Sequence, residues 1–311
     1  MLIAIGDLHG HVRALERILA AAHEKHAILR DDGGLRAGVT VLTTGDHFDR
    51  GEHGLEVIAA LQRLERGSGE VVCLFGNHEL MALAALDVAA HVAKTSISAD
   101  PVLEYAATTA HGRNGGGAFV REFGATPRAA LRSYVARMAR DGDIGGWIRR
   151  LRPAHHERVA GRKVLFTHGD VAEDLRDAAR LDSYLGRISR RLGTSSAESG
   201  GARAKWGHAD FADDESIFWD RSFVSLGDDA NGVPAAVCRA LSVDFIVTGH
   251  TPQKRITAYG ERIFRIDVGM TPTYGEHTPE ALVFTDSGIS ALRADGRERM
   301  LVAFGSRSAA A

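Results

Sequence analysis

The sequence contains few cysteines, no strong excess of charge of either sign and no long hydrophobic segment. Cys73 and Cys238 are the only cysteines among 311 residues, and two distant cysteines do not make a disulfide framework. Lysine and arginine number 38 against 40 aspartates and glutamates, so the net charge is −2 and no overall field favours nucleic acid or an anionic membrane. No stretch of about twenty apolar residues occurs, which excludes a membrane-spanning helix. Any site for an anionic ligand must therefore be local.

We expect no signal peptide at the N-terminus. The first predicted strand spans residues 2–5 and is followed at once by Gly6 and Asp7. A signal peptide would need a charged region, an apolar region and a cleavage site in succession. Apolar residues make up 44% of the chain, which is enough for a full hydrophobic core at this length. We therefore expect a globular cytoplasmic protein without a nucleic-acid or membrane partner.

Histidine, by contrast, is abundant, and much of it falls in a pattern. The chain has fifteen histidines, and five of them lie in short motifs rich in Gly and Asp. In chain order the motifs are GDLHG (6–10), GDHFDRG (45–51), GNHE (76–79), HG (168–169) and GHT (249–251). An apolar run typical of a buried strand precedes each motif, at residues 2–5, 39–42, 71–75, 164–166 and 243–247. Because loops at the carboxyl ends of strands in open α/β sheets converge on one crevice, we expect the motifs to form one site.

The segments between the motifs predict an α/β organisation followed by a helical region. Apolar residues at helical spacing predict helices over 12–22 and 55–64, which gives a βαβαβ unit with parallel strands. Residues 80–161 contain no ligand motif, are rich in Ala and Arg, and have helical stretches at 80–91 and 128–140. We interpret this range as a helical insertion within one domain of residues 1–311. It is either a cap over the site or a set of extra helices packed against the scaffold.

The C-terminal third predicts further strands and two irregular segments. Residues 262–268, 281–285 and 289–292 favour strands, and the last two are expected to form a hairpin. Residues 193–204 are rich in Ser, Gly and Ala and are expected to form a loop. The tail at 306–311 is expected to fray.

The residue types in the motifs suit a pair of divalent cations. Two close cations need hard oxygen ligands, a carboxylate that bridges them, and neutral imidazoles that complete coordination without excess negative charge. Asp7, Asp46, Asn77 and the motif histidines supply this set. The two carboxylates and a bridging hydroxide would leave the ions with net positive charge, which attracts a phosphate ester. The hydroxide would then attack phosphorus in line, without a covalent phosphoenzyme.

The five motifs in this order resemble those of the calcineurin-like metallophosphoesterase superfamily. Their forms GDxHG, GDxxDRG, GNHE, HG and GHT are closest to its phosphoprotein phosphatase branch. The resemblance covers residues 6–251, and five ordered motifs are far more specific than any one of them. It implies an α/β fold, the four-layer α/β/β/α sandwich of that superfamily with a helical insertion. The layout of residues 80–161 is also similar to that of the bacterial-type, Shewanella-like protein phosphatases.

The resemblance also implies the metal ligands. The six implied ligands are Asp7 and His9 at the first metal, Asp46 as the bridge, and Asn77, His168 and His250 at the second metal. The two ions are expected to be Mn²⁺, with Fe or Zn as alternatives, because imidazole suits these metals better than Mg²⁺.

Further residues are implied around the ions. His78 would point at the leaving oxygen as general acid, and Asp49 would hold its imidazole in place. Arg50 would bind two phosphate oxygens through its planar fork. Arg221 is either a second clamp on the phosphate or a partner in a surface salt bridge. Glu79 is expected to support the ligands rather than to bind metal.

Two motif residues depart from the pattern of the branch. His47 takes a position that is usually uncharged, and Asp170 takes the place of the second glycine in His-Gly-Gly. Asp170 would either support a metal-bound imidazole or mark a branch with another substrate. The glycine-rich turn at 114–117 is expected to be a loop, with an anion site as the weaker alternative. Histidines without ligand spacing are expected to have surface or packing roles; they are His111, His155, His156, His208 and His277.

These features predict a metal-dependent phosphomonoester hydrolase, foremost a serine/threonine protein phosphatase acting on a phosphorylated protein or a small phosphoester. One alternative is a dinucleoside polyphosphate hydrolase of the diadenosine tetraphosphate type, a related family that usually has Asp in place of Glu79. Another is a non-catalytic binding module on the same scaffold. Its signature would be a missing ligand, and none of the six is missing.

Overall fold

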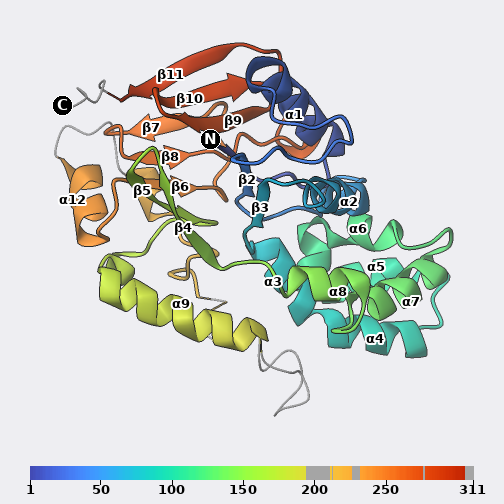
Figure 1. The fold of residues 1–311 in the computed structure, drawn as a ribbon. Coiled ribbons are helices and arrows are strands. Elements are labelled where there is room, and N and C mark those ends of the chain that lie inside the picture. The colour runs from blue at the N-terminus through green and yellow to red at the C-terminus, as the bar shows by residue number, and fades with distance from the viewer. Residues whose placement is uncertain (194–210, 212, 226–231, 276, 305–311) are drawn as a thin grey trace, which may run out of the picture.

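Two β-sheets form the centre of the computed structural model, which describes residues 1–193, 211, 213–225, 232–275 and 277–304 (Figure 1). The first sheet has the strand order β11-β10-β9-β1-β2-β3. Its strands are β1 (Leu2–Ile5), β2 (Thr40–Thr43), β3 (Glu70–Cys73), β9 (Glu280–Thr285), β10 (Gly288–Arg293) and β11 (Glu298–Ala303). Strands β1, β2 and β3 are parallel, and Ile5, Thr43 and Cys73 lie side by side at their carboxyl ends. The first three motifs therefore leave the sheet at the same level.

The second sheet has the strand order β4-β5-β6-β8-β7. Its strands are β4 (Ala154–Val159), β5 (Arg162–Thr167), β6 (Phe245–Thr248), β7 (Thr257–Tyr259) and β8 (Ile263–Arg265). Strands β5 and β6 are parallel, with Thr167 opposite Thr248. The HG and GHT motifs, which follow these two residues, therefore start next to each other.

The two sheets pack on each other through apolar side chains, and helices cover them. Phe166 of β5 contacts Phe284 of β9 with ring centroids 6.0 Å apart. Helices α1 (Val12–His26) and α2 (Gly54–Leu64) lie beside the first sheet, and α9 (Ala178–Gly193) and α12 (Val233–Ala240) lie on the side of the second (Figure 1). The predicted four-layer α/β/β/α arrangement is confirmed.

Helix α1 forms where its apolar spacing predicts. Val12, Leu15, Ile18 and Leu19 are buried on the face that packs against β10 and α2. Burial of each such side chain contributes about 1.5–3 kcal/mol, which fixes the helix to the sheet. The helix ends at His26, because Ala27 adopts a left-handed conformation.

The region between β3 and β4 is helical, and its helices α4 to α8 gather at one side of the molecule (Figure 1). The helices between β3 and β4 are α3 (Asn77–Ala84), α4 (Leu86–Thr95), α5 (Pro101–Thr108), α6 (Gly117–Arg121), α7 (Pro127–Met138) and α8 (Asp143–Ile148). The helical stretch predicted over 80–91 is divided between α3 and α4, because the helix breaks at Ala85. Asp100 and Thr126 cap α5 and α7, each followed by a proline that suits the first helical turn.

The helices of this region end with α8, before the predicted limit at residue 161. Residues 154–159 form β4, whose sequence AHHERV is too polar to indicate a strand by itself but pairs with β5 along its whole length. Short helical turns occur at η1 (Gly112–Gly116), η2 (Glu173–Leu175), η3 (Ser222–Ser225) and η4 (Pro272–Tyr274). The predicted loop at 194–204, His208 and the tail at 306–311 lie outside the described residues, and Gly193 ends α9.

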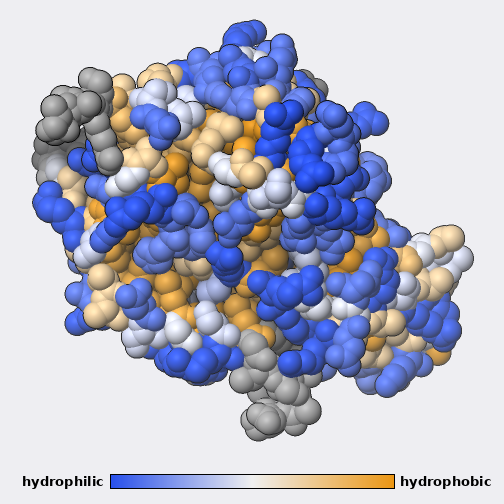
Figure 2. Space-filling view, in the orientation of Figure 1, coloured by the Kyte–Doolittle hydropathy of each residue, from blue (hydrophilic) through white to orange (hydrophobic). Residues whose placement is uncertain are grey.

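Hydrophilic side chains cover much of the face shown in Figure 2, and hydrophobic atoms show between them over the middle of the molecule. Among the described residues, none of the helices is long and apolar enough to cross a membrane.

Candidate metal centre

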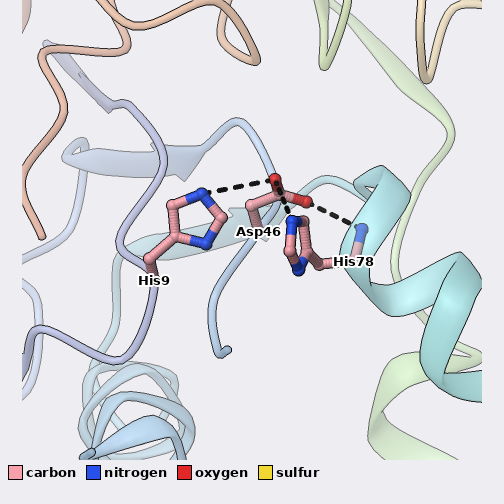
Figure 3. Close-up of side chains that lie close together, drawn as sticks. All are labelled: His9, Asp46 and His78. Atoms are coloured by element: carbon pink, nitrogen blue, oxygen red, sulfur yellow. Dashed lines mark hydrogen bonds and ion pairs between the residues drawn. The ribbon is translucent and has the colours of Figure 1, made fainter. Parts of the chain in front are cut away.

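Asp46 lies between His9 and His78, whose imidazoles both face one oxygen of its carboxylate, while the other oxygen faces the backbone of His78 (Figure 3). Its Oδ2 is 3.6 Å from His9 Nε2 and 3.9 Å from His78 Nε2. Its Oδ1 is 3.5 Å from His168 Nε2 and accepts a hydrogen bond from the His78 backbone N–H at 3.0 Å. A carboxylate whose two oxygens face different imidazoles has the arrangement that a bridging ligand requires.

The motif loops hold strained backbone. Non-glycine residues rarely adopt positive φ angles, and such residues concentrate at functional sites. Among the described residues, nine non-glycine residues do so, and five of these belong to the motifs. The five are His9, Asp46, Asp49, Arg50 and His250. Tight packing supports the strain: a Cβ on Gly76 would stand 2.3 Å from Asp46 Oδ1, so only glycine fits there.

Three histidines, His9, His168 and His250, direct a ring nitrogen, Nε2, toward the centre. In each, the backbone binds the other nitrogen, which is the usual way to orient a metal ligand. Burial lowers the pKa of all three rings, so they are neutral as ligands must be. His250 Nε2 is buried without a partner among the described residues, which is uncommon for a polar atom. The three bonds join His9 Nδ1 to the Phe48 carbonyl (3.2 Å), His168 Nδ1 to the Thr44 carbonyl (2.8 Å) and the His250 ring to the Trp219 backbone.

Asn77 and Asp7 complete the surroundings of Asp46 in different ways. Asn77 begins α3, and its Oδ1 lies 3.2 Å from His168 Nε2. Asp7 is turned toward the His250 backbone N–H, at 3.2 and 3.0 Å, and toward the Thr44 hydroxyl. Two groups of described residues bring three ligand atoms within 4.8 Å of one another, and Asp7 belongs to neither. They are His9 with Asp46 and His78, and Asp46 with His168 and His250. Coordination by Asp7 stays a prediction.

Buried negative charge at the centre calls for cations. Burial, and then the charges of Asp267 and Asp46, raise the pKa of Asp7 well above its usual range. Burial and Asp46 likewise raise the pKa of Asp267 to about 7, and Asp267 Oδ2 has no partner among the described residues. Like-charged carboxylates at a buried site are costly unless opposite charge neutralises them. Together with the neutral imidazoles, this donor set fits divalent cations.

His78 differs from the other three histidines in its partner and its charge. Its Nδ1 hydrogen-bonds Asp49 Oδ2 at 2.6 Å, and both residues are fully buried. Burial would lower the pKa of His78, but the Asp46 and Asp49 carboxylates outweigh it and raise the pKa. His78 therefore keeps a proton where the other imidazoles lose theirs. Its distance to Asp46 would also allow it to bind a metal, but a protonated imidazole is no ligand, so we favour the proton-bearing role.

Glu79 and His47 form a buried pair beneath the Asp46 loop. Glu79 accepts backbone N–H bonds from Asp46 (3.0 Å), His47 (2.9 Å) and Gly76 (2.8 Å), as well as a bond from His47 Nδ1 (3.0 Å). Burial alone would lower the pKa of His47, but the Glu79 charge and hydrogen bonds with Cys73 and Glu79 raise it to about 10. The other nitrogen, Nε2, lies 2.8 Å from Thr43 Oγ1. The departure at His47 thus has a structural reason, because the imidazolium balances Glu79.

The two arginines lie at the rim of the centre. Arg50 hydrogen-bonds His9 Nε2 and the hydroxyl of Tyr274. Arg221 donates to the His250 carbonyl at 3.2 Å and the Thr251 hydroxyl at 3.3 Å. Arg221 is therefore beside the GHT motif, and the structure gives it no salt bridge among the described residues. Tyr274 and Asp267 were missed by the sequence analysis, because both lie outside the motifs on the segment after β8.

His111, for which the sequence predicts a surface or packing role, takes the packing role. It is fully buried, and its Nε2 lies 2.9 Å from Asp49 Oδ1, a contact that the sequence did not indicate. The glycine-rich turn folds over it: a Cβ on Gly116 would stand about 2.4 Å from the His111 ring, and the Gly115 carbonyl accepts the Arg50 N–H at 3.3 Å. The glycines thus allow the backbone of this turn to pack closely against His111 and against Arg50 of the second motif.

The expectation that Asp170 supports a metal-bound imidazole is wrong. Its Oδ2 accepts the Phe223 N–H at 2.8 Å, whereas the His168 ring bonds the Thr44 carbonyl. Burial raises the pKa of Asp170 to about 6, against the opposing effect of Arg265. Among the remaining histidines, His155 pairs with Glu157 at 3.2 Å on β4, away from the motifs.

The family model of the calcineurin-like phosphoesterases matches residues 1–254, which include all five motifs. The chain belongs to this family. The phosphoesterase is therefore a metal-dependent hydrolase of phosphoric esters, and the family resemblance predicted from the motifs is confirmed.

Two curated relatives match a shorter part of the phosphoesterase. Shewanella-like protein phosphatase 1 of Plasmodium berghei is 35% identical over 86 residues, which cover 26% of this chain and 23% of the relative. Shewanella-like protein phosphatase 2 of Arabidopsis thaliana is 36% identical over 84 residues, which cover 26% and 21%. The match thus spans less than a quarter of the length of either relative.

Solved structures with the same fold cover almost the whole chain. The cold-active protein tyrosine phosphatase of a psychrophilic Shewanella species has a TM-score of 0.64 and 21% identity, covering 97% of this chain and 80% of that one. A protein serine/threonine phosphatase from Saccharomyces cerevisiae has a TM-score of 0.50 and 12% identity, covering 98% and 81%. At these identities the likeness establishes the fold.

Proposed function

We propose that this phosphoesterase is a protein phosphatase that hydrolyses phosphoserine and phosphothreonine monoesters. The observation that carries the proposal is the buried His78–Asp49 pair beside the ligand cluster. A seryl or threonyl oxygen is a poor leaving group and needs a proton as its bond to phosphorus breaks. The Asp46 charge and the hydrogen bond to Asp49 raise the pKa of His78 despite its burial, so His78 suits an alkyl ester better than a reaction with a good leaving group.

The metal ligands proposed for this reaction are the six residues of the motifs. Asp46 would bridge two divalent cations, with His9 and Asp7 on one side and the remaining three ligands on the other. The remaining three are Asn77, His168 and His250. When bound, such cations supply Lewis-acid charge and an activated water as nucleophile. We propose Mn²⁺ for both positions, because the mixed imidazole, amide and carboxylate set suits it better than Mg²⁺.

The substrate phosphate would be held by the arginines at the rim. Arg50 would donate two N–H groups to the phosphate oxygens, and Tyr274 would keep its guanidinium in place. Arg221, anchored on the His250 carbonyl, would bind a further oxygen. His78 would then donate its proton to the leaving oxygen.

The names of relatives support a phosphoprotein substrate. Shewanella-like protein phosphatases match the chain, and the Shewanella structure and the yeast structure are called a tyrosine and a serine/threonine phosphatase. The proposed preference for serine and threonine follows from the proton on His78, not from these names. A dinucleoside polyphosphate hydrolase is less favoured, because a nucleotide leaves more readily and because Glu79 stands where that family usually has Asp. A non-catalytic binding module is less favoured because all six ligands are present.

The test compares substrates and one variant. The native protein with Mn²⁺ is assayed on matched phosphoserine and phosphotyrosine peptides, a dinucleoside polyphosphate and a phosphodiester, and phosphoserine is expected to be preferred. His78→Asn should keep both metals, measured by elemental analysis, yet slow phosphoserine hydrolysis by roughly 10²–10⁴-fold, with the smallest loss on an activated aryl phosphate. Preference for the dinucleotide, or an equal loss on all leaving groups, would overturn the proposal.

A further inference from the structure

A buried chain of hydrogen bonds runs from the proposed acid into the helical region after β3. Asp49 uses both carboxylate oxygens: Oδ2 binds His78 Nδ1 at 2.6 Å, and Oδ1 binds His111 Nε2 at 2.9 Å. On the far side of its ring, His111 Nδ1 lies 2.5 Å from the Tyr105 hydroxyl. Tyr105 in turn hydrogen-bonds Tyr134 of α7. Every member of this chain is fully buried.

The partners fix the direction of the hydrogen bonds. Burial would raise the pKa of Asp49, but His111 and His78 outweigh this effect and lower it. The carboxylate is therefore ionised and accepts a hydrogen bond from each ring. Burial raises the pKa of both tyrosines, so their hydroxyls keep their protons and donate. Tyr134 then donates to Tyr105, Tyr105 to His111 Nδ1, and His111 Nε2–H to Asp49. The Tyr134 hydroxyl also lies 3.5 Å from the Ala82 carbonyl of α3, so the outer end of the network contacts the backbone.

The His111 ring is also held by packing. It stacks on Tyr134 with ring centroids 6.2 Å apart and an angle of 14° between the ring planes. It also makes a T-shaped contact with Phe48, with ring centroids 6.5 Å apart. Gly116 closes over the ring so tightly that a Cβ would stand about 2.4 Å away. The ring therefore has little freedom to rotate away from Asp49, and a carboxylate held at both oxygens cannot turn its other oxygen away from His78.

We propose that His111 is a positioning residue, which holds Asp49 so that Asp49 in turn aims the His78 imidazole at the leaving oxygen. This rests on the proposed role of His78 as general acid. It also assigns a purpose to the helical region, because α5 and α7 supply the two tyrosines that hold His111. His111 does not touch the reacting atoms and acts only through Asp49.

The decisive experiment measures how hydrolysis depends on the leaving group. His111→Phe keeps an aromatic ring and removes both hydrogen bonds. It is assayed with bound Mn²⁺ on a phosphoserine peptide and on aryl phosphates of graded leaving-group pKa. We expect kcat on phosphoserine to fall by roughly 10–100-fold, as for other residues that orient a functional group. The loss should shrink as the leaving group improves, while metal content stays unchanged.

Further variants separate positioning from general structural damage. His111→Gln places an amide N–H close to where Nε2–H stands and should restore most of the activity on phosphoserine. Tyr105→Phe removes only the outer hydroxyl, so it should show the same leaving-group dependence with a smaller loss. Met138→Leu changes a fully buried residue of α7 outside the chain of hydrogen bonds and serves as the packing control. It should leave the leaving-group dependence unchanged.

The double variant His78→Asn/His111→Phe distinguishes the two proposals. If His111 acts through His78, the double variant should be no slower on phosphoserine than His78→Asn alone. An additive loss, or an equal loss of His111→Phe on all leaving groups, would overturn the positioning role and leave the acid in place. If His78→Asn itself shows no leaving-group dependence, the proposed acid fails, and the role of His111 fails with it. Should His111→Phe not fold, Tyr105→Phe with the same substrates carries the test.

Discussion

Replacing either member of the buried His47–Glu79 pair is expected to destabilise the protein, and the two replacements should differ in a way that the hydrogen bonds predict. Glu79 binds His47 and also three backbone N–H groups, whereas His47 binds Glu79 and the Thr43 hydroxyl. His47→Gln therefore removes a charge partner and leaves the backbone bonds intact. Glu79→Gln keeps the size of the side chain but turns one accepting oxygen into a donor.

The magnitudes follow from these contacts. Removing one partner of a buried ion pair costs about 3–5 kcal/mol, and His47→Gln should lie near the lower end because the backbone continues to bind Glu79. In Glu79→Gln, an NH₂ group would face the Asp46 and Gly76 N–H groups that Oε2 now binds, or the His47 groups that Oε1 binds. Each buried donor left without an acceptor costs about 1–3 kcal/mol, so this variant should lose about 5 kcal/mol in total. It should also bind metal more weakly if the NH₂ group takes the place of Oε2, because the Asp46 N–H then loses its acceptor.

The pair also predicts how stability varies with pH. The folded-state pKa of His47 is raised from 6.5 to about 10, so its contribution is fully present below pH 6.5 and is lost as the pH rises toward 10. The folded-state pKa of Glu79 is lowered from 4.5 to about 2 by His47 and the backbone bonds despite its burial. Its contribution is present above pH 4.5 and is lost as the pH falls toward 2. Both contributions are complete between pH 4.5 and 6.5.

Urea unfolding followed by tryptophan fluorescence tests this reasoning, and it is run in chelator so that metal binding does not add to the stability. The free energy of unfolding of the native protein should decline from pH 6.5 to 10 more steeply than that of His47→Gln. In a double-mutant cycle at pH 6, the two changes together should cost about 2–3 kcal/mol less than their sum. Additive costs, or single losses below about 1 kcal/mol, would show that the pair is not an ion pair in the folded protein.

Three further predictions concern the proposed centre. Protein stripped by a chelator should be inactive on an aryl phosphate and regain activity with Mn²⁺ better than with Mg²⁺; full activity of the metal-free protein would contradict a metal mechanism. Asp46→Asn should lower the occupancy of both metal positions, measured by elemental analysis, more than His9→Asn does, and two retained metals with near-native turnover would refute its bridging role. Arg50→Lys keeps the charge but loses the planar fork, so it should impair monoester hydrolysis nearly as much as Arg50→Ala; native-like kinetics of Arg50→Lys would instead point to a diffuse charge effect.

The central layers of the fold could be predicted because their sequence signals are local. The apolar runs before the motifs form β1, β2, β3, β5 and β6, and the helical spacing after the first motif forms α1. Strands β4 and β11 could not be predicted, since they are polar, partly exposed edge strands whose stability comes from pairing with β5 and β10. The break at Ala85 could not be predicted either, because alanine is a strong helix former and so gives no sign that a helix ends there.

In the candidate site, too, residues with a local sequence signal could be predicted and residues without one could not. Its motif residues could be found because each follows a strand, and strand order then brings them together. Asp267, Tyr274 and His111 could not be found, because nothing in their local sequence distinguishes them from surface residues. Only the fold places the loop after β8 against Arg50, and the turn before η1 against Asp49.

The environment, rather than the residue type, separates the four imidazoles around Asp46. His9, His168 and His250 each bind a backbone carbonyl or other neutral backbone group, and burial leaves them neutral with a lone pair toward the centre. His78 binds an ionised carboxylate instead and keeps its proton. Because that carboxylate is Asp49, whatever holds Asp49 also decides which imidazole is the acid. The helical region reaches Asp49 through His111, so its packing and the chemistry of the centre are coupled through a single carboxylate.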